Sequence, residues 1–127
     1  MQTLEKIFSV RDKVVIITGG AGMLGLEYAK ALSSAGARVV LFDVVDDPQL
    51  SHGVNALYRK VDIAERDAVF AAVAEIEKEY GRIDVLINNA AVNPVPGSTE
   101  SKDQFLPYED YPEKLWNKEL AVGLSGA

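Results

Sequence analysis

The feature that most constrains the fold of this chain is a cluster of glycines between two segments of different periodicity. Val14 to Thr18 is a short run of β-branched residues, as expected for a strand buried on both faces. Met23 to Ala35 is rich in helix formers and precedes Gly36, where a left-handed C-cap would fall. The junction, residues 18–25, reads TGGAGMLG. The sequence therefore predicts a strand, a tight glycine turn and a helix in direct succession.

The rest of the chain continues this alternation of strands and helices. Further strands are predicted at Arg38 to Asp43, Ala56 to Val61 and Ile83 to Ile87, and an amphipathic helix at Ala64 to Tyr80. Because the crossovers are long enough to return the chain in parallel, they predict a parallel sheet with right-handed connections. The expected fold class is α/β, with a Rossmann-type doubly wound parallel sheet in the strand order 3-2-1-4, truncated after about four strands.

Apolar spacing assigns a buried face to the first two helices. Leu24 and Tyr28 lie on the expected stripe of the first helix, and Val69 and Ile76 on that of the second. The strand Ile83 to Ile87 is expected to form an edge of the sheet with unpaired backbone groups and apolar faces on both sides. Such an edge predicts either self-association into a homo-oligomer or continuation of the sheet in a longer parent chain.

The region after the fourth strand differs from the others. Asn93 to Asp110 is predicted to be a long loop of the kind found at active sites, and a last helix is predicted to start near Asp110. Asp110 and Glu113 have capping-box spacing, Pro112 fits the first turn, and Trp116 begins an apolar stripe. We therefore expect this helix to be capped by Asp110 and to carry an apolar stripe that could take part in self-association together with the fourth strand.

The composition of the chain argues against several classes of binding partner and of catalytic or metal site. The 127 residues, with a net charge of -6, form one domain, and the acidic balance argues against nucleic acid and against a membrane partner. There is no cysteine, and His52 is the one histidine, so we expect no disulfide, thiolate nucleophile or metal site. No segment reads as a signal peptide or a membrane span. Together these features favour a cytoplasmic protein.

The glycine cluster also has a chemical interpretation. Between a strand and a helix, Gly19 permits the tight turn, Gly22 lets the backbone approach a pyrophosphate, and Gly25 lets the helix pack closely on the sheet. The helix N-terminus supplies unpaired N–H groups and the positive end of the helix dipole. The alternative is a plain strand-to-helix turn whose glycines serve steric needs alone. The candidate contacts to a dinucleotide diphosphate are Gly19, Gly20, Gly22, Met23, Leu24 and Gly25.

An acidic residue lies where the second strand ends. Asp43 follows Gly25 by eighteen residues, close to where a carboxylate would accept hydrogen bonds from the adenosine ribose hydroxyls. Its charge would repel a 2′-phosphate, and Val44 follows it in place of a basic residue, so the sequence favours NAD over NADP. The alternative is a solvated aspartate in an acidic patch with Asp46 and Asp47.

Three motifs in this order resemble the N-terminal half of a classical short-chain dehydrogenase/reductase, from about Phe8 to the end of the chain. They are the glycine loop, Val61-Asp62-Ile63 after the third strand, and Asn88-Asn89-Ala90-Ala91 after the fourth. The resemblance implies a Rossmann-type fold, a nicotinamide cofactor and interconversion of a carbonyl and an alcohol on a small-molecule substrate. The whole chain, 1–127, would be an incomplete dinucleotide-binding domain.

The resemblance also implies further cofactor contacts. By position, Asp62 and Ile63 would face the adenine, while Asn89 and Ala90 would line the ribose and nicotinamide side. The spacing of Asp62 to Glu65 is equally consistent with a helix cap.

This sequence departs from the family pattern at several positions. Met23 stands where the family has a glycine, Ala91 replaces the last glycine of Asn-Asn-Ala-Gly, and Gly123 stands where the family has an asparagine. Ala91 is tolerable if its φ is negative. The family's catalytic serine and Tyr-x-x-x-Lys pair lie further along, and no Tyr-x-x-x-Lys occurs in these residues. His52 falls in a loop far from the expected nicotinamide, so we expect no catalytic residue here.

Two functions remain open from the sequence. In the first, the chain is the cofactor-binding half of an NAD-dependent reductase or dehydrogenase, inactive alone, and the 127 residues are part of a longer parent. In the second, it is a non-catalytic dinucleotide-binding regulatory module or subunit, which Gly123 and the missing tyrosine favour. The substrate is not specified by either.

Overall fold

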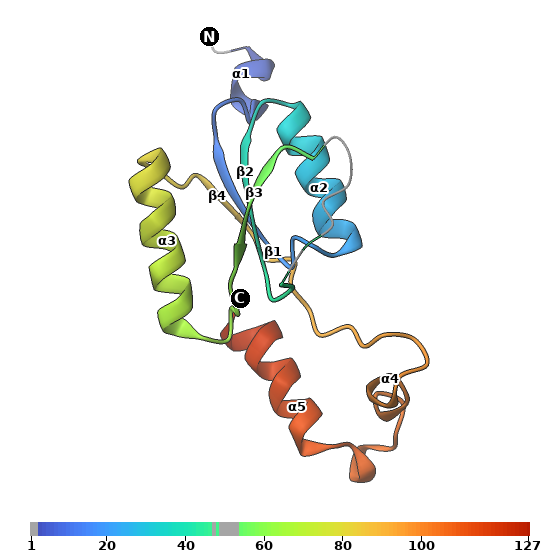
Figure 1. The fold of residues 1–127 in the computed structure, drawn as a ribbon. Helices are drawn as coiled ribbons and strands as arrows, with labels where there is room; N and C mark the ends of the chain where they lie inside the picture. The colour runs from blue at the N-terminus through green and yellow to red at the C-terminus, as the bar shows by residue number, and fades with distance from the viewer. Residues whose placement is uncertain (1–2, 47, 49–53) are drawn as a thin grey trace.

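The computed structural model describes residues 3–46, 48 and 54–127. His52 and Asp47, which the sequence singled out, lie outside the described residues. After a short N-terminal helix, the chain forms the strands and the two helices that pack on them, and three short segments and one longer helix follow (Figure 1). The elements are α1 (Leu4–Phe8), β1 (Val14–Thr18), α2 (Met23–Ser34), β2 (Arg38–Asp43), β3 (Ala56–Lys60), α3 (Arg66–Tyr80), β4 (Val85–Ile87), α4 (Thr99–Asp103), the 3-10 turn η1 (Tyr108–Asp110), α5 (Glu113–Leu120) and the π-helical turn η2 (Ala121–Ser125).

The four strands form one parallel sheet in the order β3-β2-β1-β4. Ile16 of β1 pairs with Val40 of β2 on one side and with Leu86 of β4 on the other. The predicted fold class and strand order are therefore confirmed. β4 is an edge of this sheet, with Val85 37% and Leu86 54% exposed, as expected from the sequence.

The core lies on both faces of the sheet because β1 alternates its side chains between two helices. Figure 1 shows α2 against one face and α3 against the other. Val14 and Ile16 belong to the cluster that contains Ile76 of α3, while Val15 and Ile17 belong to the one with Ala29 of α2. All five residues of β1 are buried, which explains why its sequence is a continuous apolar run without polar alternation.

The buried face of α2 differs from the predicted stripe. Gly25 and Ala29 are the buried residues of this helix, whereas Leu24 is 56% and Tyr28 41% exposed. The reason is steric: glycine and alanine form the part of the helix closest to the loop and sheet, and Leu26 and Leu32 pack beside them against the same cluster. The prediction for α3 is confirmed, since Ile76 is buried and Val69 packs against the same cluster.

The segment that the sequence predicted as a long loop contains two short elements, α4 and η1. Ser98 caps α4 by accepting a hydrogen bond from the Ser101 N–H at 3.1 Å. The expected cap of the last helix is wrong, because Asp110 lies within η1 and Pro112 is the N-cap of α5, without a side-chain cap.

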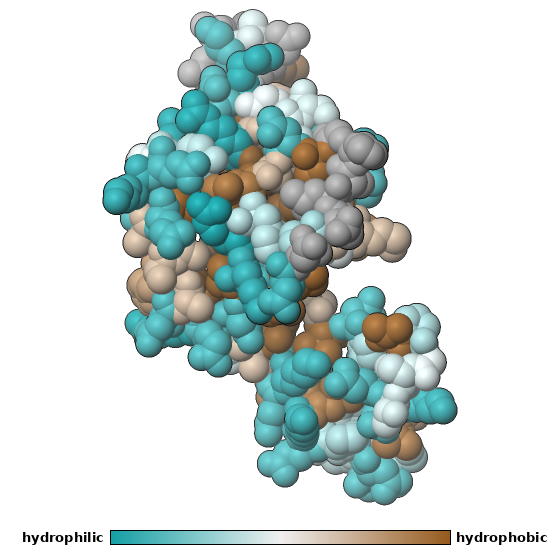
Figure 2. Space-filling model, viewed as in Figure 1, coloured by the Kyte–Doolittle hydropathy of each residue, from teal (hydrophilic) through white to brown (hydrophobic). Residues whose placement is uncertain are grey.

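The α4–α5 segment forms a lobe beside the sheet, with apolar surface among its polar side chains (Figure 2). Leu115, and not Trp116, is its buried residue, and Trp116 makes an edge-to-face contact with Tyr111 at 6.4 Å between centroids. Trp116 is 49% exposed. Over the described ranges, no helix is both long and apolar enough to cross a membrane.

Candidate functional site

The turn after β1 requires glycine at two positions. Gly19 has a φ of +63°, and a Cβ on it would lie 2.8 Å from the Cα of Ala90. Gly20 donates its N–H to the Phe42 carbonyl at 3.1 Å, and a Cβ there would lie 2.6 Å from the Cβ of Leu41. The loop therefore lies directly against the carboxyl ends of β2 and β4, which fixes its position relative to both strands.

Backbone amides without an intrahelical acceptor follow the glycine turn, at the N-terminus of α2. Gly22 is the N-cap, and the Leu26 N–H makes the first helical bond, to the Gly22 carbonyl at 3.0 Å. The amides of Met23, Leu24 and Gly25 precede that bond and have no intrahelical acceptor. Together with the helix dipole, such amides attract anions. Met23 and Leu24 line the adjacent pocket, so their amides are the ones available to a ligand there.

Gly25 has a packing role in this arrangement. A Cβ at Gly25 would lie 2.5 Å from the Gly19 carbonyl oxygen and 2.7 Å from the Cα of Gly20. The absence of a side chain therefore lets α2 start against the loop. Gly22 is less crowded, since its Cβ would meet the Gly19 oxygen at 3.3 Å.

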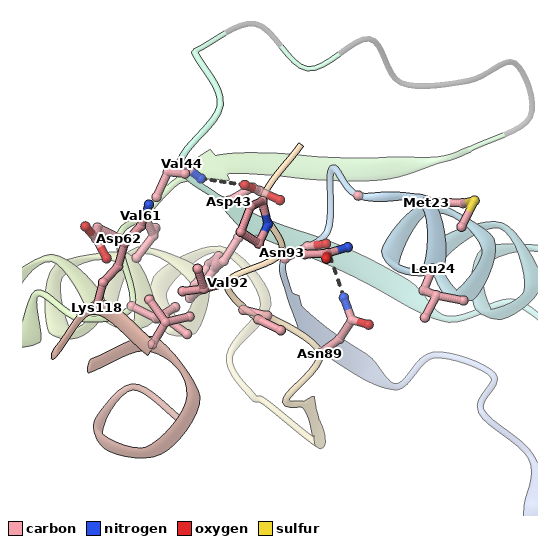
Figure 3. A pocket seen from close by; sticks show the side chains of 18 of the residues that line it. Met23, Leu24, Asp43, Val44, Val61, Asp62, Asn89, Val92, Asn93 and Lys118 are labelled. Carbon is pink, nitrogen blue, oxygen red and sulfur yellow. Dashed lines mark hydrogen bonds between the residues drawn. The ribbon is translucent and has the colours of Figure 1, made fainter. Parts of the chain in front are cut away.

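The Asp43 carboxylate joins the end of β2 to this loop. Its Oδ2 accepts a hydrogen bond from the Ala21 N–H at 3.0 Å. Its Oδ1 accepts one from the Val44 N–H at 2.7 Å, which Figure 3 shows as a dashed line. Asp46 instead forms an ion pair with Lys60, whose ammonium lowers the pKa of Asp46. Asp43 is thus a fixed, half-buried carboxylate and not a freely solvated member of an acidic patch.

The end of β4 is joined to the loop by Asn89. Its Nδ2 donates to the carbonyls of Thr18 at 3.0 Å and Gly19 at 3.2 Å. The Thr18 hydroxyl accepts the N–H groups of Asn89 at 3.1 Å and Ala90 at 3.0 Å, and donates to the Ile87 carbonyl at 3.4 Å. Five hydrogen bonds therefore set the distance between the glycine loop and β4.

The alternative interpretation of Asp62 as a helix cap is wrong. Its Oδ1 accepts the Ala64 N–H at 2.9 Å and closes the turn after β3, while Glu65 holds the N-cap position of α3. The backbone at Ala91 does not require glycine, because its φ is not positive. Among the described residues, Asp12 is the one non-glycine residue with a positive φ. Ala91 therefore needs no glycine conformation.

These elements enclose a pocket of about 580 Å³ at the carboxyl ends of the strands (Figure 3). Met23 and Leu24 lie at one end of it, and Asp62 and Lys118 at the other. The predicted site residues that line it are Gly19, Gly22, Met23, Leu24, Asp43, Asp62, Ile63, Asn89 and Ala90. Gly20 and Gly25 do not line it and shape the loop from behind.

Sequence reasoning missed one wall of the pocket. Glu100 of α4 and Lys118 of α5 line it and form an ion pair, with 3.6 Å between the Lys118 Nζ and the Glu100 Oε2. Nothing in their local sequence indicates this, because it depends on how the lobe folds back towards the sheet. The other unpredicted lining residues are Phe42, Val44, Val61, Ala91, Val92, Asn93, Pro94 and Val122.

The charges around the pocket are mainly negative. Asp43, Asp62 and Glu100 face one cation, Lys118, which pairs with Glu100. Attraction for a diphosphate must therefore come from backbone amides and the helix dipole rather than from basic side chains. In the part of the chain that the structure describes, no three His, Cys, Asp or Glu side chains gather as a metal site would require.

Comparisons with known proteins agree with the fold and the motif order. Residues 13–127 match the family described as short chain dehydrogenase. A curated NAD-dependent glycerol dehydrogenase from Listeria innocua is 34% identical over 127 residues, which cover 97% of this chain and 46% of that protein.

Two solved structures extend the comparison. The NAD+-bound structure of a xylitol dehydrogenase is 27% identical, with a TM-score of 0.77, over 92% of this chain and 44% of that one. A metagenomic short-chain oxidoreductase in complex with NADP is 28% identical, with a TM-score of 0.74, over 93% and 52%. The chain thus spans about half the length of the proteins it matches.

Proposed function

Because this chain belongs to the short-chain dehydrogenase family, we propose that it is the cofactor-binding half of an oxidoreductase that interconverts a carbonyl and a secondary alcohol with NAD. The observation that carries the proposal is one pocket in which the free amides of Met23 and Leu24, the Asp43 carboxylate and the end of β4 all meet. The alternative of a non-catalytic regulatory module is not favoured, since the relatives compared above are named as dehydrogenases or oxidoreductases.

The residues of the pocket fit a nicotinamide dinucleotide part by part. The amides at the start of α2 would hold the diphosphate, and Asp43 would accept the hydroxyls of the adenosine ribose. Asp62 and Ile63 would face the adenine, with Asn89 and Ala90 towards the nicotinamide. The cavity volume of about 580 Å³ lies within the usual range for cofactor sites. When bound, NAD supplies the hydride acceptor or donor, which no side chain can provide.

Preference for NAD over NADP follows from the charge beside the ribose. A 2′-phosphate would lie next to the Asp43 carboxylate, where like charges repel. The neighbouring cation, Lys60, is held by Asp46 and does not line the pocket. The one basic residue among the described residues that line the pocket, Lys118, is paired with Glu100.

The substrate class we propose is a small polyhydroxylated alcohol or the corresponding carbonyl compound. The support is that the names of two relatives specify glycerol and xylitol, which are both polyols. The parent protein would supply the groups that donate or accept the proton at the substrate oxygen. A homo-oligomeric state and a cytoplasmic location stay predictions from the sequence.

The test is calorimetric titration of the chain with NADH and NADPH, with Asp43→Asn as the variant. The substituted amide keeps the shape of the side chain but loses its charge, so the preference for NADH should fall by about 10-fold or more, the value of a charge-assisted hydrogen bond. Asp46→Asn is the matched control, because Asp46 does not line the pocket. The preference of this variant for NADH over NADPH should equal that of the unmodified chain. Tighter binding of NADPH than NADH to the unmodified chain would contradict the proposed cofactor.

A further inference from the structure

A tyrosine on β3 contacts the backbone that carries Asp43, although it is not part of the pocket lining. The Tyr58 hydroxyl lies 3.1 Å from the Asp43 carbonyl oxygen and 2.5 Å from the Val45 carbonyl oxygen. Its ring packs on the α2 face of the sheet, in the cluster with Leu41. The Tyr58 ring lies at the partly buried edge of the core. Its hydroxyl therefore links the core to the backbone of Asp43 and Val45, the two residues on either side of Val44.

This contact is needed because the sheet ends at Asp43. The last paired residues of β2 and β3 are Asp43 and Lys60, and the Val61 N–H still reaches the Asp43 carbonyl at 2.8 Å. Beyond that point Val44 and Val45 have no strand partner, and their side chains are 57% and 44% exposed. Apolar burial does not hold this segment, so its attachments to β3 are the Tyr58 hydroxyl and, one residue further on, the solvent-exposed ion pair between Asp46 and Lys60.

The orientation of the Asp43 carboxylate depends on that segment. One carboxylate oxygen accepts the Val44 N–H, inside the attached segment, and the other accepts the Ala21 N–H, in the glycine loop. If Val44 moved, the first bond would be lost and the Ala21 N–H alone would hold the carboxylate. A continuous path of hydrogen bonds thus runs from Tyr58 through Asp43 to Ala21.

We propose that Tyr58 is a positioning residue for dinucleotide recognition, which holds the Asp43 carboxylate in the direction that accepts the adenosine ribose hydroxyls. This inference rests on the proposed function, because it assigns the ribose of an adenine dinucleotide to Asp43. It adds that the discrimination between a ribose hydroxyl and a 2′-phosphate depends on a residue outside the pocket. Burial and the charges of Asp43 and Asp46 raise the pKa of Tyr58, so the hydroxyl stays protonated as a donor.

The binding test uses the full chain and Tyr58→Phe, which removes one oxygen and keeps the ring. The dissociation constant for NADH should rise about 3- to 10-fold, the value of one neutral hydrogen bond, while that for NADPH changes less. Adding Tyr58→Phe to Asp43→Asn should produce little further loss, because the two residues act through one contact. Tyr80→Phe is the matched control, since Tyr80 is also partly buried but packs on the α3 face.

A second measurement does not depend on cofactor binding. In the chain without ligand, Tyr58→Phe should raise hydrogen exchange at the Ala21 amide about 3- to 10-fold relative to the core amide of Ile17, and Tyr80→Phe should not. If the chain binds no dinucleotide but Ala21 responds, the proposed function fails and the hydrogen-bond path stands. If Tyr58→Phe lowers the melting temperature while the Ala21 exchange ratio and the NADH preference stay unchanged, Tyr58 is only structural and the inference is overturned.

Discussion

Gly25 offers the most quantitative test of how the glycine loop is built. A methyl group there would lie 2.5 Å from the Gly19 oxygen and 2.7 Å from the Cα of Gly20, and both atoms belong to the backbone and cannot rotate away. Gly123, in η2, is the matched control, because it is also helical but has nothing within 4 Å of its Cβ position. The two alanine substitutions thus differ mainly in steric overlap.

The magnitude follows from two opposing terms. Glycine to alanine inside a helix stabilises by about 1 kcal/mol, and this gain applies to both positions. At Gly25 the overlap forces a backbone shift, and overpacking of this kind costs about 1–3 kcal/mol. We therefore expect Gly123→Ala to stabilise the chain by about 1 kcal/mol and Gly25→Ala to be less stable than Gly123→Ala by about 1–3 kcal/mol.

Urea denaturation of both variants measures this difference directly. Gly25→Ala should also weaken NADH binding, because the shift moves the start of α2 and its free amides away from the loop. Equal stability of the two variants would refute the close packing of α2 against the loop.

Two further substitutions test contacts outside the pocket and at its edge. The pKa of Asp84 is held low by its hydrogen bond to Arg82, then by the Val14 N–H. A lowered folded-state pKa gives stability that is present above the ordinary value of 3.8 and lost as the pH falls through the folded value. Asp84→Asn should therefore be less stable at neutral pH, and the difference should shrink below about pH 4 in pH-dependent melting curves. Asn89→Ala should lower the free energy of unfolding by about 1–3 kcal/mol in urea denaturation, because the carbonyls of Thr18 and Gly19 lose their donor. Asn88 is exposed, so Asn88→Ala is the control and should change this free energy by no more than about 0.5 kcal/mol.

The strands could be predicted from local sequence because burial on both faces demands continuous apolar runs. β1 and β2 have the predicted bounds, since the apolar run of each ends sharply, before Thr18 in β1 and before Asp43 in β2. The strand order followed from the crossovers, whose handedness is nearly fixed. These features depend on short-range patterns and on one general rule.

The parts that could not be predicted depend on distances between elements. The buried face of α2 is set by how closely Gly25 lets the helix approach, which apolar spacing does not encode. Asn89 rather than Asn88 bonds to the loop because it lies opposite Thr18 once β4 has ended. The Glu100–Lys118 wall needs the whole lobe to be in place.

The most direct test of the account is an NMR titration of the isotope-labelled chain with NADH, followed at individual backbone amides. The account predicts saturable shifts at Met23 and Leu24, whose amides are proposed to hold the diphosphate, and at Ala90, with the amide of Gly81 at the far end of α3 unchanged. If saturating NADH leaves the amides of Met23 and Leu24 unshifted, the start of α2 does not bind a dinucleotide, and the central claim is contradicted.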